Sequence, residues 1–500
     1  MSYFPIQGFA PDAEPTTPGV IVDIDLMVPT LTGLRALPSD SSTGLQTVGS
    51  AVRSAAVLSN LSDEQTVYVG TADNLFKQST TGFAEISSST NAYSLSGAAR
   101  WVFAEFNLPG DDRALAAAHG QDIQFVTSGD FADLTGAPKA AFVAVTEGFL
   151  MAANIQTSTV GSSSTVYSAA PNRWYCAGIN TTNVWDADIA TQATTGLLLD
   201  TPGGIRALHK LGSFFIFYKE RSMYIGRYVG SPQVWRMTLI PGDGLGAPSH
   251  HSVVDIETAH LFPGYDDFYL FDGTRPNPIG TNRVSEFFFN DLNAEHKSQI
   301  VGHHDRRNSL VYWSYPSTDS ADGSLDKFIC YNYRSDKWGG GTKSMQFIFE
   351  WTATGVTYDD LGALYSTYAD LPTAPYDTAF ASTTTLKTAV FDTNNRLSAL
   401  EGSPANDCMM RTWDFGIDGA PTLLTRVRPR FKKAPLTGSQ THIYQDIEGG
   451  SEVTNGPAAT LSDGSFDFVF GGRWHAVRHN YTGDVEVSGI DIQMQQDGEE

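Results

Sequence analysis

The chain repeats one module: an apolar run, a polar turn, a second run rich in aromatic residues, and a further turn. Its clearest copy is residues 214–218, a turn around Glu220, residues 223–226 and finally Trp235. Each copy holds one or two hairpins of roughly 4–8-residue strands, which are too small to bury their own apolar faces. Such units must stack on one another, around an axis or along a line. The pattern therefore predicts an all-β repeat protein.

The repeats resemble propeller blades in size. Further copies centre on residues 268–273, 310–315 and 328–338. Their spacing is irregular, at about 35–50 residues, which is in the range of blades of four strands each. Candidate units run from residue 50 to residue 345, and the best helix candidates are the short segments 285–292 and 294–300. We therefore expect a β-propeller-like domain over residues 49–404.

The two ends of the chain differ from the repeats. Residues 1–48 are interrupted by prolines, which break any long element. We interpret them as an extended N-terminal arm that lies over other structure; a flexible leader is the alternative. Residues 405–500 hold several strand candidates, and the last, residues 485–494, alternates in polarity with a bulge at Gly489. This segment predicts a C-terminal β-sandwich domain.

The charge of the chain limits its function. Its formal net charge is −23, whereas a protein that reads nucleic-acid sequence should show a basic footprint. Acidity does not exclude a protein that passes DNA along without gripping it, because carboxylates repel phosphates. Solubility alone is the simpler explanation of the charge.

The cysteines indicate a reducing compartment. Cys176, Cys330 and Cys408 are far apart and odd in number, so they suggest no disulfide framework. The first residues lack the charged start and apolar stretch of a signal peptide. No run approaches the roughly 18 apolar residues of a membrane helix. We expect a chain made in the cytoplasm, with no membrane-spanning segment.

Two histidine pairs are weak candidates for a metal site. His250 and His251 are adjacent, as are His303 and His304. Adjacent residues on a strand point to opposite faces, so neither pair can chelate one ion from regular β-structure. We interpret them as polar loop histidines and expect no metal ligands.

The paired carboxylates Asp111–Asp112 and Asp266–Asp267 invite a comparison with glycosidases, which use two carboxylates. Turn chemistry explains them more simply, because aspartate satisfies its own backbone in turns. The glycine run 339–341 is not followed by a helix that could help to hold phosphate, so a flexible turn is expected there. Phosphate-loop and nucleophile-elbow motifs are both absent from the sequence. We expect no catalytic residues and no cofactor.

One dense basic segment stands out in this acidic chain. Arg426, Arg428, Arg430 and Lys432 alternate along an expected strand and would share one face. Pro429 lies among them, which favours the edge of a sheet. The four cations form a candidate interaction patch for an acidic neighbouring subunit or a phosphate backbone. A solvated edge strand protected by its charges is the alternative.

Short stretches along nearly the whole chain carry a family resemblance. They are residues 18–23, 29–33, 218–224, 261–269, 280–284, 331–338, 472–475, 483–484 and 488–491. On these stretches the chain resembles the tail nozzle, or packaged-DNA stabilisation (tail tubular), proteins of short-tailed bacteriophages. The resemblance implies a β-propeller-containing subunit in a homo-hexameric ring below the portal and its adaptor. The lumen of the ring would conduct the genome and be closed before infection, although no motif identifies a gate loop.

The expected function is therefore that of a non-enzymatic virion protein, the nozzle ring of a short phage tail. Its partners would be the portal-adaptor, the tail fibre proteins and genomic DNA that passes without sequence-specific binding. It would be made in the host cytoplasm and located in the virion tail. Two alternatives stay open: a receptor-binding or fibre-anchoring tail protein, which a trimer would favour, and a propeller glycosidase, which turnover of a glycoside would support.

Overall fold

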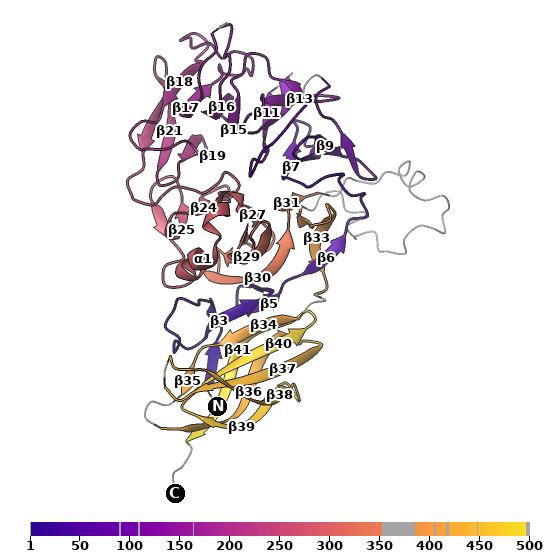
Figure 1. The fold of residues 1–500 in the computed structure, drawn as a ribbon, viewed down its shortest axis with the longest axis vertical. Coiled ribbons are helices and arrows are strands. Elements are labelled where there is room, and N and C mark those ends of the chain that lie inside the picture. Colours follow the sequence, from indigo (N-terminus) through magenta and orange to yellow (C-terminus); the bar gives the residue numbers. More distant parts are fainter. Residues whose placement is uncertain are drawn as a thin grey trace, which may run out of the picture.

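The computed structural model describes residues 2–89, 92–108, 111–163, 165–352, 386–404, 407–416, 420–447 and 449–496 (Figure 1). Over these ranges the regular secondary structure is almost entirely strand. The exceptions are one α-helix, α1 (Ser285–Asp291), and one 3-10 helix, η1 (Ala294–Gln299). A ring of sheets fills the upper part of Figure 1 and a stack of strands lies below it. The predicted all-β propeller-like fold and the two short helices are confirmed.

Five wedges of the ring follow one another along the chain. Each is an antiparallel meander of four strands, and its first strand lies closest to the axis of the ring. In chain order they are β7 (Ser54–Ser59), β8 (Gln65–Gly70), β9 (Leu75–Gln78) and β10 (Phe83–Glu85); β11 (Val102–Leu108), β12 (Asp111–Ala117), β13 (Gln124–Val126) and β14 (Ala132–Asp133); β15 (Ala140–Thr146), β16 (Phe149–Ile155), β17 (Ala170–Cys176) and β18 (Thr194–Leu197); β19 (Ala207–Leu211), β20 (Phe214–Tyr218), β21 (Met223–Gly230) and β22 (Val234–Leu239); and β23 (Val254–Asp255), β24 (His260–Pro263), β25 (Phe268–Phe271) and β26 (Pro276–Pro278).

Two further sets of strands complete the ring. The first is β27 (Val301–Asp305), β28 (Leu310–Tyr315), β29 (Leu325–Asn332) and β30 (Lys337–Met345). The second is β31 (Phe347–Trp351), β32 (Lys387–Phe391), β33 (Leu397–Gly402) and β6 (Ser39–Ser42). β31 lies beside both β27 and β7, which closes the circle. Because β6 pairs with β33 through Ser42 and Ser398, the start of the chain supplies the last strand of the closing sheet.

One sheet continues from the ring into the lower domain. From β27–β30 it passes through β4 (Met27–Pro29) and β5 (Leu34–Ala36) to β41 (Glu486–Gln496), β36 (Thr422–Lys433) and β39 (Phe466–Gly472). β1 (Ser2–Pro5) pairs with β41 as well. The result is a ten-stranded sheet shared by the two domains, visible in Figure 1 as the succession β30, β5 and β41.

A second sheet faces this one and forms the sandwich. It contains β2 (Gly8–Phe9), β3 (Val20–Asp25), β34 (Cys408–Thr412), β40 (Trp474–Thr482), β37 (Thr437–Gln445), β38 (Val453–Thr460) and β35 (Phe415–Gly416). Side chains of both sheets, among them Val427 and Tyr481, join one buried cluster. Residues 2–48, expected as an arm, thus supply strands to the sandwich, to the shared sheet and to the ring.

The expectation of a flexible turn at residues 339–341 is wrong. All three glycines lie inside β30, where the shared sheet passes from the ring to β4. A Cβ atom at Gly341 would lie 2.1 Å from the backbone nitrogen of Leu26, and one at Gly339 would lie 2.7 Å from the carbonyl oxygen of Met27. The glycines are there because two backbones meet too closely for side chains.

Candidate functional site

The basic segment lies on β36 with its cations exposed. Arg426, Arg428, Arg430 and Lys432 alternate with less accessible side chains such as the buried Val427. β41 pairs with β36 along its length, whereas pairing with β39 ends at Val427. Among the described strands, none therefore pairs with the second side of residues 428–433, and Pro429 lies in this edge segment, where proline is tolerated.

Most of this positive charge is already matched by carboxylates. The ion pairs are Arg426 with Asp467 at 2.5 Å, Arg430 with Asp491, and Lys432 with Glu486 at 3.8 Å. Within the described part of the chain, no carboxylate lies within 4.0 Å of Arg428. The strip is therefore of mixed charge, with Arg428 as the cation that a partner could still use.

A second set of polar residues joins the ring to the sandwich. Asp12 accepts the backbone N–H groups of Glu286 at 2.7 Å and Phe287 at 2.9 Å, which caps the start of α1. Burial raises the pKa of Asp12, although these two hydrogen bonds act against the shift. Arg283, just before α1, pairs with Asp336 at 2.8 Å. The N-terminal segment, α1 and the hairpin β29–β30 are held together here.

The carboxylate pair Asp266–Asp267 lies beside this joint. Asp267 is buried and accepts the N–H of Gly280 at 3.0 Å and the hydroxyl of Ser285 at 2.6 Å. Asp266 accepts the hydroxyl of Tyr269 at 2.8 Å. Asp267 is thus occupied by donors of a turn and of α1, and Asp266 by a side chain of β25, as expected of structural aspartates.

The other carboxylate pair lies near the hairpin of β11 and β12. Asp112 accepts the backbone N–H of Leu61 at 2.9 Å. The side chain of Asp111 lies outside the described residues. Asp112 thereby ties the turn between β7 and β8 to the neighbouring wedge.

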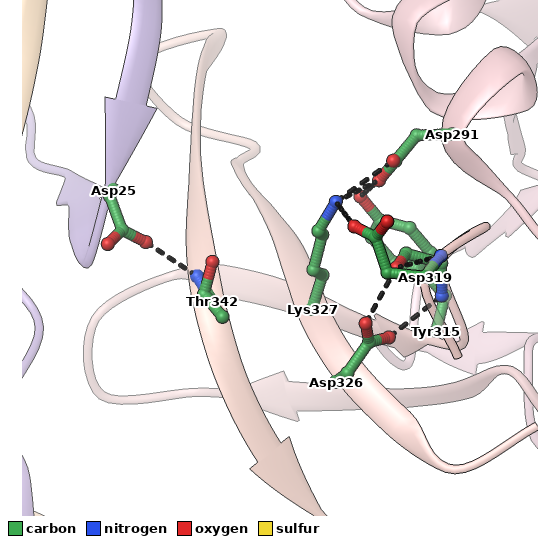
Figure 2. Close-up of polar contacts among 8 residues, drawn as sticks. Asp25, Asp291, Tyr315, Asp319, Asp326, Lys327 and Thr342 are labelled. Atoms are coloured by element: carbon green, nitrogen blue, oxygen red, sulfur yellow. Dashed lines mark hydrogen bonds and ion pairs between the residues drawn. The ribbon is translucent and has the colours of Figure 1, made fainter. Parts of the chain in front are cut away.

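Figure 2 shows a further charged cluster beside β29. Lys327 Nζ lies 2.9 Å from Asp291 and 3.4 Å from Asp319. The hydroxyl of Tyr315 donates to Asp291 at 2.9 Å. Burial works to lower the pKa of Lys327, but the hydrogen bonds and charges of Asp291 and Asp319 raise it on balance. The lysine ammonium occupies the centre of the carboxylates and links α1 to the ring.

The expectation of polar loop histidines is wrong for His303 and His304, whereas His250 and His251 do lie in the loop before β23. His303 and His304 lie on β27, the innermost strand of its wedge. Burial lowers the pKa of His303 to about 3, and its Nε2 contacts the hydroxyl of Thr388 at 3.0 Å. His251 is partly buried, and its pKa is lowered to about 3 by burial first and by the charge of Arg100 second. Ring closure buries residues that look peripheral in the sequence.

Comparisons with known proteins give little guidance. No family model and no curated protein matches the chain. Among solved structures, the extracellular domain of a putative hybrid two-component system from B. thetaiotaomicron matches at 9% identity and a TM-score of 0.38. That match covers 87% of this chain and 47% of the other, so the chain spans about half of its length. A glycoside hydrolase matches at 8% identity and a TM-score of 0.24, covering 96% of this chain and 99% of the other. Likenesses this weak carry no argument about function.

Proposed function

We propose that the chain is a structural subunit of a short phage tail, which assembles into the nozzle ring and retains and conducts packaged DNA. The proposal rests on the resemblance of the short stretches to that family. Its partners would be further copies of the chain, the portal-adaptor and the tail fibre proteins. Its place would be the virion tail. A helix long and apolar enough to span a bilayer does not occur in the described ranges.

The observation that best supports the proposal is where these stretches lie. Five of them contribute to one buried cluster that joins the ring to the sandwich. Their members there are Ile21, Leu261, Phe268, Val284, Tyr331, Trp338 and Ile490. Stretches far apart in sequence thus share one task, which is to fix the two domains relative to each other. A fixed angle between domains is what a subunit of a closed ring needs, because each copy must repeat the same interface.

The charge of the chain fits a conduit that does not hold DNA. Each phosphate neutralised by a cation adds salt-dependent grip, which would slow passage. With a net charge of −23 and most cations of the basic strip paired, a ring of such chains would present a wall that repels DNA. The free side of residues 428–433 is then better suited to an acidic neighbouring subunit than to the genome.

The test is the oligomeric state of the purified chain, alone and with the adaptor. We expect six-fold rings in negative-stain images and the matching mass in light scattering. A monodisperse monomer at micromolar concentration in the presence of the adaptor would overturn the proposal. A trimer that binds host cells or fibre protein would favour the receptor-binding or fibre-anchoring alternative.

A further inference from the structure

A cavity of about 340 Å³ lies at one end of the propeller axis and has an unusual charge for this protein. Its lining includes Arg100, Arg206, His119, His250, His251 and Ser249. None of the described residues that line it is Asp or Glu, although the chain as a whole has 55 acidic and 32 basic residues. The cavity is therefore locally cationic in an acidic molecule.

Arg100 is a partly buried cation of this cavity. One of its terminal N–H groups donates to the carbonyl of Arg53 at 2.7 Å and another to that of Gln299 at 3.4 Å. Its Nε is buried without a hydrogen-bond partner. No carboxylate among the described residues lies within 4.0 Å of the guanidinium, which lies over the ring of Phe347 with its Cζ 5.6 Å from the ring centroid. Burial lowers the pKa of Arg100 to about 10, so it stays charged at neutral pH. A buried charge without a counter-charge is costly.

His250 offers a second donor in the same cavity. Its Nδ1 accepts the backbone N–H of Leu208 at 3.4 Å. Burial first, and the neighbouring His209 and His251 next, hold the pKa of His250 well below its usual value, so the ring is neutral. A neutral imidazole that accepts at Nδ1 carries its proton at Nε2. The Nε2–H group is therefore available to a ligand.

The cavity on the other side of the propeller axis is lined by acidic residues. A second cavity of about 250 Å³ is lined by Glu105 and Asp255 together with Lys210. His250 lines both cavities and thus marks the boundary between them. An anion entering the axis is repelled from the acidic side and attracted to the side of Arg100.

We propose that the cavity at Arg100 binds a small anion that carries a carboxylate or phosphate group, with the guanidinium as its counter-charge and His250 Nε2–H as a second donor. Guanidinium groups match both oxyanions in geometry. The volume suits a ligand of metabolite size. Phe142, which stacks on His250 with ring centroids 5.3 Å apart, supplies an apolar wall for its carbon skeleton. The site is independent of the nozzle function.

The test is isothermal titration of the full chain with sodium phosphate and with sodium succinate, at constant ionic strength kept by sodium chloride. We expect saturable binding of at least one of the two anions, which also identifies the preferred oxyanion. Arg100→Gln should weaken this binding at least tenfold. Arg227→Gln, which removes a cation stacked on Phe214 outside the cavity, is the matched control and should leave binding unchanged.

A second variant covers the case in which Arg100→Gln does not fold. Ala99 lines the same cavity, and Ala99→Glu supplies an internal carboxylate beside Arg100. We expect Ala99→Glu to abolish anion binding and to raise the melting temperature of the free protein. Absence of saturable binding of both anions to the wild type would overturn the proposal. So would unchanged binding in a folded Arg100→Gln or in Ala99→Glu.

Discussion

Replacing Gly341 with alanine should weaken the sheet that connects the two domains. The added Cβ would lie 2.1 Å from the backbone nitrogen of Leu26 and 2.8 Å from its Cα, and both are backbone atoms that cannot rotate away. The strands would have to separate by roughly 1 Å to reach the 3.0 Å that real Cβ atoms keep. Overpacking of this kind costs about 1–3 kcal/mol. The neighbouring bond from the N–H of Thr342 to Asp25, 2.7 Å long and drawn in Figure 2, adds about 1 kcal/mol if it is lost.

Alanine also gains something in a strand, because glycine loses more backbone entropy on folding, by about 0.5–1 kcal/mol. The net loss in free energy of unfolding is then about 2 kcal/mol. Urea denaturation followed by tryptophan fluorescence measures it, since Trp338 and Trp413 are buried near the joint. Gly49→Ala is the matched control, because nothing lies within 4 Å of a Cβ there, and it should stay within about 0.5 kcal/mol of wild type. Equal midpoints for Gly341→Ala and Gly49→Ala would refute the argument.

Three further predictions concern the sandwich, the joint and the basic strip. Burial lowers the pKa of His442 to about 4 and of His479 to about 3, whereas a histidine in the unfolded chain has a pKa of about 6.5, so the unfolded chain binds more protons below that pH. The free energy of unfolding should therefore be constant above about pH 6.5 and fall as the pH drops towards 4, and His442→Gln should flatten this slope in thermal melts. Stability that rises on acidification would contradict the assignment. Asp267→Asn should lower the free energy of unfolding by about 1–3 kcal/mol in urea denaturation, because a buried side chain that accepts from two or more donors becomes partly a donor itself. An unchanged midpoint would show that these hydrogen bonds make no net contribution to stability. Arg428→Glu should leave the free energy of unfolding within about 1 kcal/mol of wild type yet lower the fraction of assembled rings in light scattering. Undiminished assembly would exclude the strip as a subunit contact.

The wedges of the ring could be predicted because their signal is local. Each module encodes its hairpin within a few dozen residues. Residues 214–226, for example, contain two apolar runs around one turn. The closing strand β6 could not be found in this way. Its sequence, Ser39–Ser42, has no apolar alternation, and its partner Ser398 lies more than 300 residues away. The pairing depends on the completed ring and not on the strand itself.

The glycine run is a second feature whose cause lies in a contact between segments far apart in the sequence. Glycine in a sequence indicates backbone freedom, so residues 339–341 suggest a turn. The actual cause is the approach of Leu26 and Met27, which the local sequence does not contain. The same holds for Arg100: its neighbours in the sequence do not distinguish it, and its surroundings are formed by residues of other wedges. The basic segment on β36 was visible in the sequence, but its carboxylate partners come from β39 and β41 and became apparent only in the sheet.

The shared sheet makes the connection between the two domains rigid. Two domains joined by a linker can change their angle at little cost, because few contacts cross the boundary. Here the boundary is crossed by backbone hydrogen bonds from β30 through β4 and β5 to β41, and the same strands bury one continuous apolar cluster. A change of angle would have to break main-chain pairing and open that cluster at once. The sandwich and the ring therefore keep one relative orientation, so that a contact made by β36 with a neighbouring molecule also fixes the orientation of the propeller.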